Sequence, residues 1–363
     1  MNGLLMRPLE ELALLLKPAG AGLYLVSTGR AEQERLQQRL YDAASPEEVQ
    51  RRFLAALESV ATAKAVLVGV PSDVGAGFRR GANLGPQAIR TRLLDDGFDL
   101  RAHGVVDLGD VFCVPQLLED DMLSPEQLAA TRRALYPGVA AALPVSPLSI
   151  ERRVFELVLS LNPGLKPFVL GGDHSTALPV VQALAKVAPA PWGIVQSDAH
   201  TDLLETRLGI RHCFATWSWH ANELLGRAGR LVQVGIRASG RDRAHWESTT
   251  QVRQFWAKEI LDDPEAALDA VVAHVKASEV KGVYFSNDID GTDASWADAT
   301  GTPEPAGLTP DWLVELIRRL GREVGFLGGD VMEVAPPLSA TPEVTVGLAA
   351  RYLREQLLAA TAR

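Results

Sequence analysis

Cysteine is scarce in this sequence, with only Cys113 and Cys213 among 363 residues. Two thiols cannot build a disulfide framework or a thiolate metal site, which excludes the small disulfide-stapled proteins, so both are read as small hydrophobic residues. No apolar run reaches the roughly 18 residues that a membrane-spanning helix needs. The beginning of the chain also lacks the charged and apolar segments of a signal peptide. We therefore expect a soluble, cytoplasmic protein with no membrane partner.

A surplus of basic residues is missing as well. The 36 Lys and Arg residues face 45 Asp and Glu residues, which gives a formal net charge of -9. Such a balance argues against a broad phosphate-binding surface, and we expect no nucleic-acid partner. With 47% hydrophobic and 22% charged residues, the composition excludes disordered and collagen-like chains.

From about residue 63 the sequence alternates between apolar strand patterns and helix patterns. Strands are predicted at 65–70, 105–109, 167–170, 192–196, 231–236, 282–285 and 324–327. Helices are predicted to begin near residues 86, 150, 177, 266, 310 and 344. This order predicts an α/β fold with three αβα layers around a central, mainly parallel sheet.

Residues 1–62 read differently, as a helical N-terminal extension to a main domain that covers 63–363. Helices are predicted over 32–40 and 46–60, and Ser45 is suited to cap the second one. Leu54, Leu57 and Val60 are expected to pack on the main domain or on a neighbouring subunit.

Acidic and imidazole side chains follow several of the predicted strands. Four such exits are present, at 171–174, 198–202, 288–290 and 329–333. Side chains two residues apart share one face of an extended segment. Because ligands bind at the carboxyl ends of parallel strands, we expect these four exits to converge.

The side chains at these exits have the chemistry of metal ligands. The candidates are His174, Asp198, His200, Asp202, Asp288 and Asp290. Six ligands are too many for one ion that must also hold water, which favours two ions bridged by carboxylates. Oxygen-rich coordination with some imidazole and no thiolate favours Mn²⁺, while Ni²⁺, Co²⁺, Fe²⁺ and Zn²⁺ remain open.

Three of these segments carry a family resemblance. Residues 171–175 (GGDHS), residues 198–202 (DAHTD) and residues 286–293, followed by 301–303 (GTP), resemble the three signatures of the arginase/agmatinase (ureohydrolase) family. The resemblance runs from about Lys64 to the C-terminus. It implies an arginase-like fold and a binuclear metal-dependent hydrolase that releases urea and an amine from a small guanidino compound. Since members of the family are commonly trimers or hexamers, it also implies a homo-oligomer.

Carried over residue by residue, the resemblance also implies a role for each site residue. One ion would be held by His174, Asp198, Asp202 and Asp288, and the other by His200, Asp198, Asp288 and Asp290. A hydroxide shared by the ions would attack the guanidinium carbon. Glu333 would pair with the guanidinium, His212 would carry protons to the leaving amine, and Asp293 would stabilise the tetrahedral intermediate.

The sequence differs from arginases at the positions with which arginases bind the amino-acid end of their substrate. Leu204 stands where arginases carry an asparagine, and a leucine cannot accept a hydrogen bond from an α-ammonium group. The exit at 235–240 also lacks the aspartate that arginases use. An agmatinase-like or guanidino-acid substrate is therefore favoured over L-arginine.

The specificity loop departs from agmatinases too. Phe214 and Trp217 are bulky, and we expect them to reshape the substrate pocket. Arg207 and Arg211 either pair with a substrate carboxylate or are ordinary loop arginines.

Two alternatives remain open. A formimidoylglutamase-type hydrolase that releases formamide is supported by the possible carboxylate-binding arginines. A catalytically silent metal-binding regulator is suggested by Ala294 and Asp298, which replace prolines usual in the family.

Overall fold

The computed structural model describes residues 6–23 and 27–362. Within these residues, nine strands form one sheet in the order β1-β3-β2-β4-β9-β8-β5-β6-β7. The strands are β1 (Leu16–Lys17), β2 (Ala65–Gly69), β3 (Val105–Val111), β4 (Lys166–Leu170), β5 (Gly193–Ser197), β6 (Leu231–Ile236), β7 (Arg253–Trp256), β8 (Val283–Asn287) and β9 (Phe326–Val331). Every neighbouring pair is parallel except β1 with β3. The predicted α/β fold with a mainly parallel sheet is confirmed.

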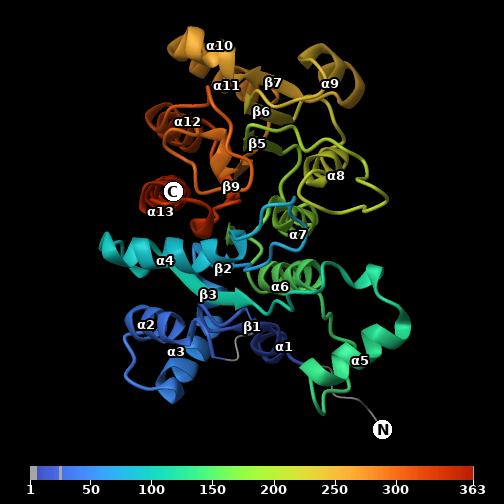
Figure 1. Cartoon of the computed structure of the whole chain (residues 1–363), viewed down its shortest axis with the longest axis vertical. Coiled ribbons are helices and arrows are strands. Elements are labelled where there is room, and N and C mark those ends of the chain that lie inside the picture. Colours follow the sequence, from blue (N-terminus) through green and yellow to red (C-terminus); the bar gives the residue numbers. More distant parts are fainter. Residues whose placement is uncertain (1–5, 24–26, 363) are drawn as a thin grey trace.

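Helices cover both faces of this sheet (Figure 1). The α-helices are α1 (Pro8–Leu15), α2 (Arg30–Leu40), α3 (Pro46–Glu58), α4 (Gly85–Asp95), α5 (Pro125–Leu135), α6 (Pro147–Leu161), α7 (Ala177–Leu184), α8 (Trp217–Leu224), α9 (Arg243–Thr250), α10 (Ala257–Asp262), α11 (Pro264–Ala277), α12 (Pro310–Glu323) and α13 (Pro342–Thr361). One core cluster joins the sheet to α1, α3, α6, α7 and α8, and the other joins it to α4, α10, α11, α12 and α13. No helix among the described residues is long and apolar enough to cross a membrane.

The N-terminal segment is tied into the main core. Ser45 caps α3 by accepting a hydrogen bond from the Glu48 amide at 3.3 Å, as predicted. Leu57 and Val60 are buried in the core, whereas Leu54 is 40% exposed. The segment also adds a strand that the sequence did not predict, because β1 pairs antiparallel with β3. The division into 1–62 and 63–363 remains a prediction.

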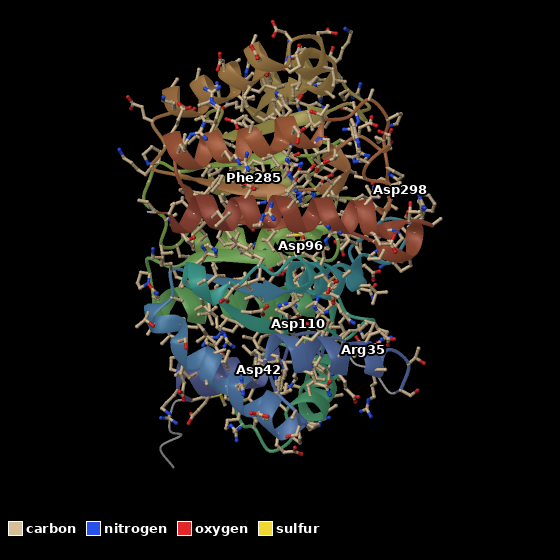
Figure 2. The ribbon with its side chains drawn as sticks, turned by 90° about the vertical axis from the view of Figure 1, so that its left-hand side faces the viewer. Arg35, Asp42, Asp96, Asp110, Phe285 and Asp298 are labelled. Atoms are coloured by element: carbon tan, nitrogen blue, oxygen red, sulfur yellow. The ribbon has the colours of Figure 1, made fainter. Side chains whose placement is uncertain are left out.

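A buried cluster of charged side chains links α4 to β3, near the edge of the sheet that β1 forms. The Arg90 guanidinium makes a bidentate ion pair with Asp107, at 2.8 and 2.9 Å, and a further ion pair with Asp110. The second oxygen of Asp110 accepts a hydrogen bond from the Gly20 amide at 2.7 Å. Figure 2 shows Asp110 at the level where the N-terminal helices meet the sheet. Arg90 therefore links α4, β3 and the N-terminal segment.

Candidate metal centre

The candidate metal ligands converge at the carboxyl ends of three strands. Ser197 and Asn287, the last residues of β5 and β8, are register partners, so Asp198 and Asp288 leave the sheet side by side. The Asp288 amide also donates to the Ser197 carbonyl at 3.0 Å. His174 follows β4 in a short 3-10 turn, His174–Thr176. The predicted convergence at the strand ends is thus observed.

One group of candidate ligands surrounds His174. Its Nδ1 lies 3.0 Å from Asp288 Oδ2 and 3.3 Å from both Asp198 Oδ2 and Asp202 Oδ2. His174, Asp198, Asp202 and Asp288 are all buried. A second group surrounds His200, whose Nδ1 lies 3.1 Å from Asp290 Oδ2 and 3.6 Å from Asp198 Oδ1. The two oxygens of Asp198 therefore face different histidines.

This donor set fits two metal ions. His174, Asp198 and Asp202 form one group that could hold an ion, and Asp198, His200 and Asp290 form another. Within each group the ligand atoms lie within 4.8 Å of one another. Burial, followed by the charges of Asp290 and Asp198, raises the pKa of Asp288 well above its usual range. Since buried carboxylates crowded in this way need cations, the arrangement is consistent with the binuclear centre that the sequence predicts.

Trp217 lies beneath the first group rather than at the surface. Its indole N–H donates to Asp202 Oδ2 at 3.0 Å, and its ring stacks on His174 with centroids 4.5 Å apart. The side chain is fully buried. The sequence predicts that Trp217 contacts the substrate, and this role stays a prediction; the structure shows contacts of the side chain with two ligand candidates, Asp202 and His174. Asp202 itself has a positive φ of 51°, a conformation that a tight local fold must enforce.

His174 is also held from its other side. Its Nε2 lies 3.0 Å from Ser286 Oγ, and that hydroxyl lies 2.9 Å from Asp330 Oδ2. This arrangement leaves Nδ1 to face the carboxylates. Ser286 belongs to a quoted signature, but the sequence carries no signal for its contact with His174 or for the part that Asp330 plays.

Of the predicted catalytic residues, Glu333 contacts a ligand candidate directly, and His212 and Asp293 are held by other partners. Glu333 is buried with a positive φ of 62°, and its Oε1 accepts a hydrogen bond from the His174 amide at 3.0 Å. His212 is 7% exposed, and its Nδ1 lies 2.6 Å from Glu119 Oε2. Asp293 accepts hydrogen bonds from the Ser295 and Gly307 amides, each at 2.9 Å. Glu119 is a partner that the sequence did not single out, because it lies ninety-three positions from His212 in the chain.

Apart from Glu333 and Trp217, the predicted substrate contacts are either exposed or line a cavity. Leu204 is 42% exposed and Arg211 is exposed. Phe214 and Arg207 line a cavity of about 470 Å³, together with Glu119, Cys213, Val74, Phe78 and Met122. The Arg207 guanidinium lies 4.9 Å from the centre of the Phe214 ring, within cation–π distance.

Metal binding by this centre should release protons. Burial lowers the pKa of His200, but Asp290 and Asp198 outweigh it and raise this pKa to about 12. Burial also lowers the pKa of His174. The three neighbouring carboxylates outweigh this effect and raise the pKa well above its usual range. Both imidazoles are thus protonated at pH 7 without metal, whereas an imidazole must be neutral to bind a metal ion. We expect Mn²⁺ to displace at least the two imidazole protons, so that affinity rises with pH, roughly tenfold per unit for each proton displaced.

Calorimetric titration with Mn²⁺ in buffers of different ionisation enthalpy measures this release. A His245→Asn variant, which changes a histidine outside both groups, should release the same number of protons. Binding that is independent of pH between 6 and 8 would contradict the protonated state of the two imidazoles.

Comparison with known proteins agrees with this geometry. The family model described as "Arginase: Arginase family" matches residues 63–359. The chain belongs to the arginase family and is a metal-dependent hydrolase of linear amidines.

Individual relatives cover most of the chain. It is 31% identical over 305 residues to a guanidinobutyrase of Pseudomonas aeruginosa, a match that covers 81% of this chain and 85% of the relative. It is also 31% identical to a mitochondrial guanidino acid hydrolase of Homo sapiens, covering 81% and 78% of the two chains. Among solved structures, the agmatine ureohydrolase of Thermoplasma volcanium is similar with a TM-score of 0.62 at 28% identity, covering 83% and 90%. The predicted family is confirmed.

Proposed function

We propose that this protein uses two Mn²⁺ ions to hydrolyse a guanidino compound to urea and an amine, with an agmatine-like or guanidino-acid substrate rather than L-arginine. The proposal rests mainly on the position of Asp198. Its two carboxylate oxygens face His174 and His200, which belong to separate groups of candidate ligands. In this proposal His174, Asp202 and Asp288 complete one ion's site, and His200, Asp288 and Asp290 complete the other. When bound, two such cations lower the pKa of a shared water enough to supply hydroxide near neutral pH.

Glu333 is suited to hold the substrate guanidinium. Burial, followed by the charge of Asp173, raises the pKa of Glu333 well above its usual range, so a cationic partner would stabilise its ionised form. Its Oε1 is engaged by the His174 amide, while Oε2 has no hydrogen-bond partner within the part of the chain that the structure describes. A guanidinium paired there would be oriented next to the candidate ligands.

His212 and Asp293 supply proton transfer and charge stabilisation in this proposal. Because Glu119 engages Nδ1 of His212, Nε2 is the nitrogen left to give a proton to the leaving amine. Burial raises the pKa of Asp293, but hydrogen bonds from Ser295 and Gly307 outweigh it and lower this pKa. Asp293 is therefore a carboxylate at neutral pH, which suits it to stabilise positive charge on the departing nitrogen.

The substrate preference rests on Leu204, the cavity and the relatives. Leu204 has no polar group to bind an α-ammonium. Relatives of this chain include proteins described as guanidinobutyrase and guanidino acid hydrolase, whose names specify guanidino substrates that are acids. Arg207 lies at the cavity and Arg211 nearby in the same loop, where either could pair with a carboxylate.

A substrate panel with resolved products tests the proposal. Mn²⁺-loaded protein is incubated with agmatine, 4-guanidinobutyrate, 3-guanidinopropionate, guanidine, L-arginine and formiminoglutamate. We expect urea from agmatine or a guanidino acid, at a kcat/KM well above that for L-arginine. Formamide from formiminoglutamate would instead establish the formimidoylglutamase alternative. No product from any compound, with both ions confirmed bound, would favour the silent regulator.

We further propose a trimer or hexamer in the cytoplasm. Cys113 and Cys213 are both free and buried, which suits a reducing compartment. Light scattering coupled to size-exclusion chromatography measures the assembly, and a monomer at micromolar concentration would contradict it.

A further inference from the structure

A row of glutamines crosses the sheet and ends on Asp198. Gln254 of β7, Gln233 of β6 and Gln196 of β5 are successive register partners. All three side chains are fully buried, although each strand also contains apolar residues that pack in the core. A buried amide is tolerated only when its hydrogen bonds are made. Because the strands lie next to one another at one end of the sheet (Figure 1), each amide can reach the next.

The hydrogen bonds of this row all run in one direction. The Trp256 indole donates to Gln254 Oε1 at 2.9 Å, and Gln254 Nε2 donates to Gln233 Oε1 at 2.7 Å. Gln233 Nε2 then donates to Gln196 Oε1 at 2.7 Å, and Gln196 Nε2 donates to Asp198 Oδ2 at 2.7 Å.

The two ends of the row fix this direction. An indole N–H can only donate, and an ionised carboxylate can only accept. Reversing any one amide would place two oxygens or two NH₂ groups against each other. Side bonds reinforce the same orientation, because Ser218 Oγ donates to Gln196 Oε1 at 2.7 Å and Gln233 Nε2 donates to the Thr201 carbonyl at 2.6 Å.

We propose that Gln254, Gln233 and Gln196 form a positioning relay that orients Asp198 for the two metal ions and supports its negative charge. Aligned hydrogen bonds polarise one another in a dry interior, so the donor that reaches Asp198 is strengthened by those behind it. Groups behind a metal ligand set its orientation and typically change metal affinity by about 10- to 100-fold when they are removed. Through the relay, residues as far away as β7, at the edge of the sheet, influence the orientation of Asp198. This inference rests on the metal centre proposed above.

The first test compares metal affinity in three single variants. We expect Gln196→Leu to weaken Mn²⁺ binding by about 10- to 100-fold. Gln254→Leu, which touches no ligand candidate, should weaken it less but in the same direction. Gln37→Leu is the matched control, because Gln37 is also buried and donates to a carbonyl, that of Ala19, far from the centre. Unchanged affinity in Gln196→Leu, or equal losses in Gln254→Leu and Gln37→Leu, would overturn the relay.

Side-chain amide NMR tests the relay even if a variant unfolds or if no metal binds. Side-chain amide NMR of the wild-type protein during titration with diamagnetic Zn²⁺ should show shifts that decrease from Gln196 to Gln233 to Gln254, with none at Gln37. In the metal-free state, Gln254→Leu should still move the Gln196 amide signals. Failure of wild-type protein to bind any ion would remove the proposed function, whereas Gln196 signals that ignore Gln254→Leu would remove the relay alone.

Discussion

Asp198→Asn is expected to abolish metal-dependent activity while leaving the fold intact. Asp198 is the carboxylate shared by both groups, and it accepts further hydrogen bonds from Gln196 Nε2 at 2.7 Å and the His200 amide at 2.6 Å. An asparagine keeps the size of the side chain but loses its charge and one ligand oxygen. Metal ions contribute several kcal/mol of transition-state stabilisation, so kcat/KM should fall by at least about 1000-fold. Bound Mn²⁺ per chain, measured by elemental analysis, should fall with it.

The control removes the same charge away from the site. Asp121 is exposed and lies outside both candidate metal groups, so Asp121→Asn should keep full metal content and activity. Two tightly bound ions and wild-type turnover in Asp198→Asn would refute the shared-ligand assignment. Loss of metal without loss of any measurable activity would support the regulator alternative.

Arg90→Met should cause the largest loss of stability. Arg90 is 1% exposed and Asp110 is 2% exposed, so the substitution leaves buried carboxylates without their cation. Removing one partner of a buried ion pair typically costs about 3–5 kcal/mol. Urea denaturation followed by circular dichroism measures this change in the free energy of unfolding. Because Asp110 also binds the Gly20 amide, limited proteolysis should cut the N-terminal segment faster in the variant.

Two further variants separate the buried charge from simple loss of volume. Arg92 lies on the same helix but is partly exposed and pairs with Asp96 one turn away, so Arg92→Met should cost no more than about 1 kcal/mol. Adding Asp110→Asn to Arg90→Met removes one stranded carboxylate and should restore part of the loss. Equal destabilisation by Arg90→Met and Arg92→Met would contradict the role of the buried pair.

The sequence predicted the parallel sheet well because its strands are continuous apolar runs, such as Val66 to Val68. It missed β7, whose four residues include Arg253 and Gln254, and it missed the short helix α10. It also missed β1, whose two residues gain their pairing only from contact with β3. Local pattern cannot reveal strands that depend on a distant partner.

At the candidate site, the six ligand candidates could be named because they follow strands with a period of two. The residues that hold these side chains in place could not be predicted from the sequence. Glu119 contacts His212 from a distant part of the chain, and no local pattern predicts that the Trp217 indole donates to Asp202. The three glutamines lie in separate strands, and only the register of the sheet joins them into a row.

The short strand β1 has a consequence for solubility. A sheet edge with unpaired N–H and C=O groups can recruit a strand from another molecule and so begin aggregation. Here β1 pairs with the last two residues of β3, and just beyond them the Phe112 amide donates to the Leu15 carbonyl at 3.1 Å and the Cys113 amide to the Gly22 carbonyl at 2.8 Å. The N-terminal segment thus occupies the backbone groups at this end of β3, so that a strand from another molecule cannot pair there.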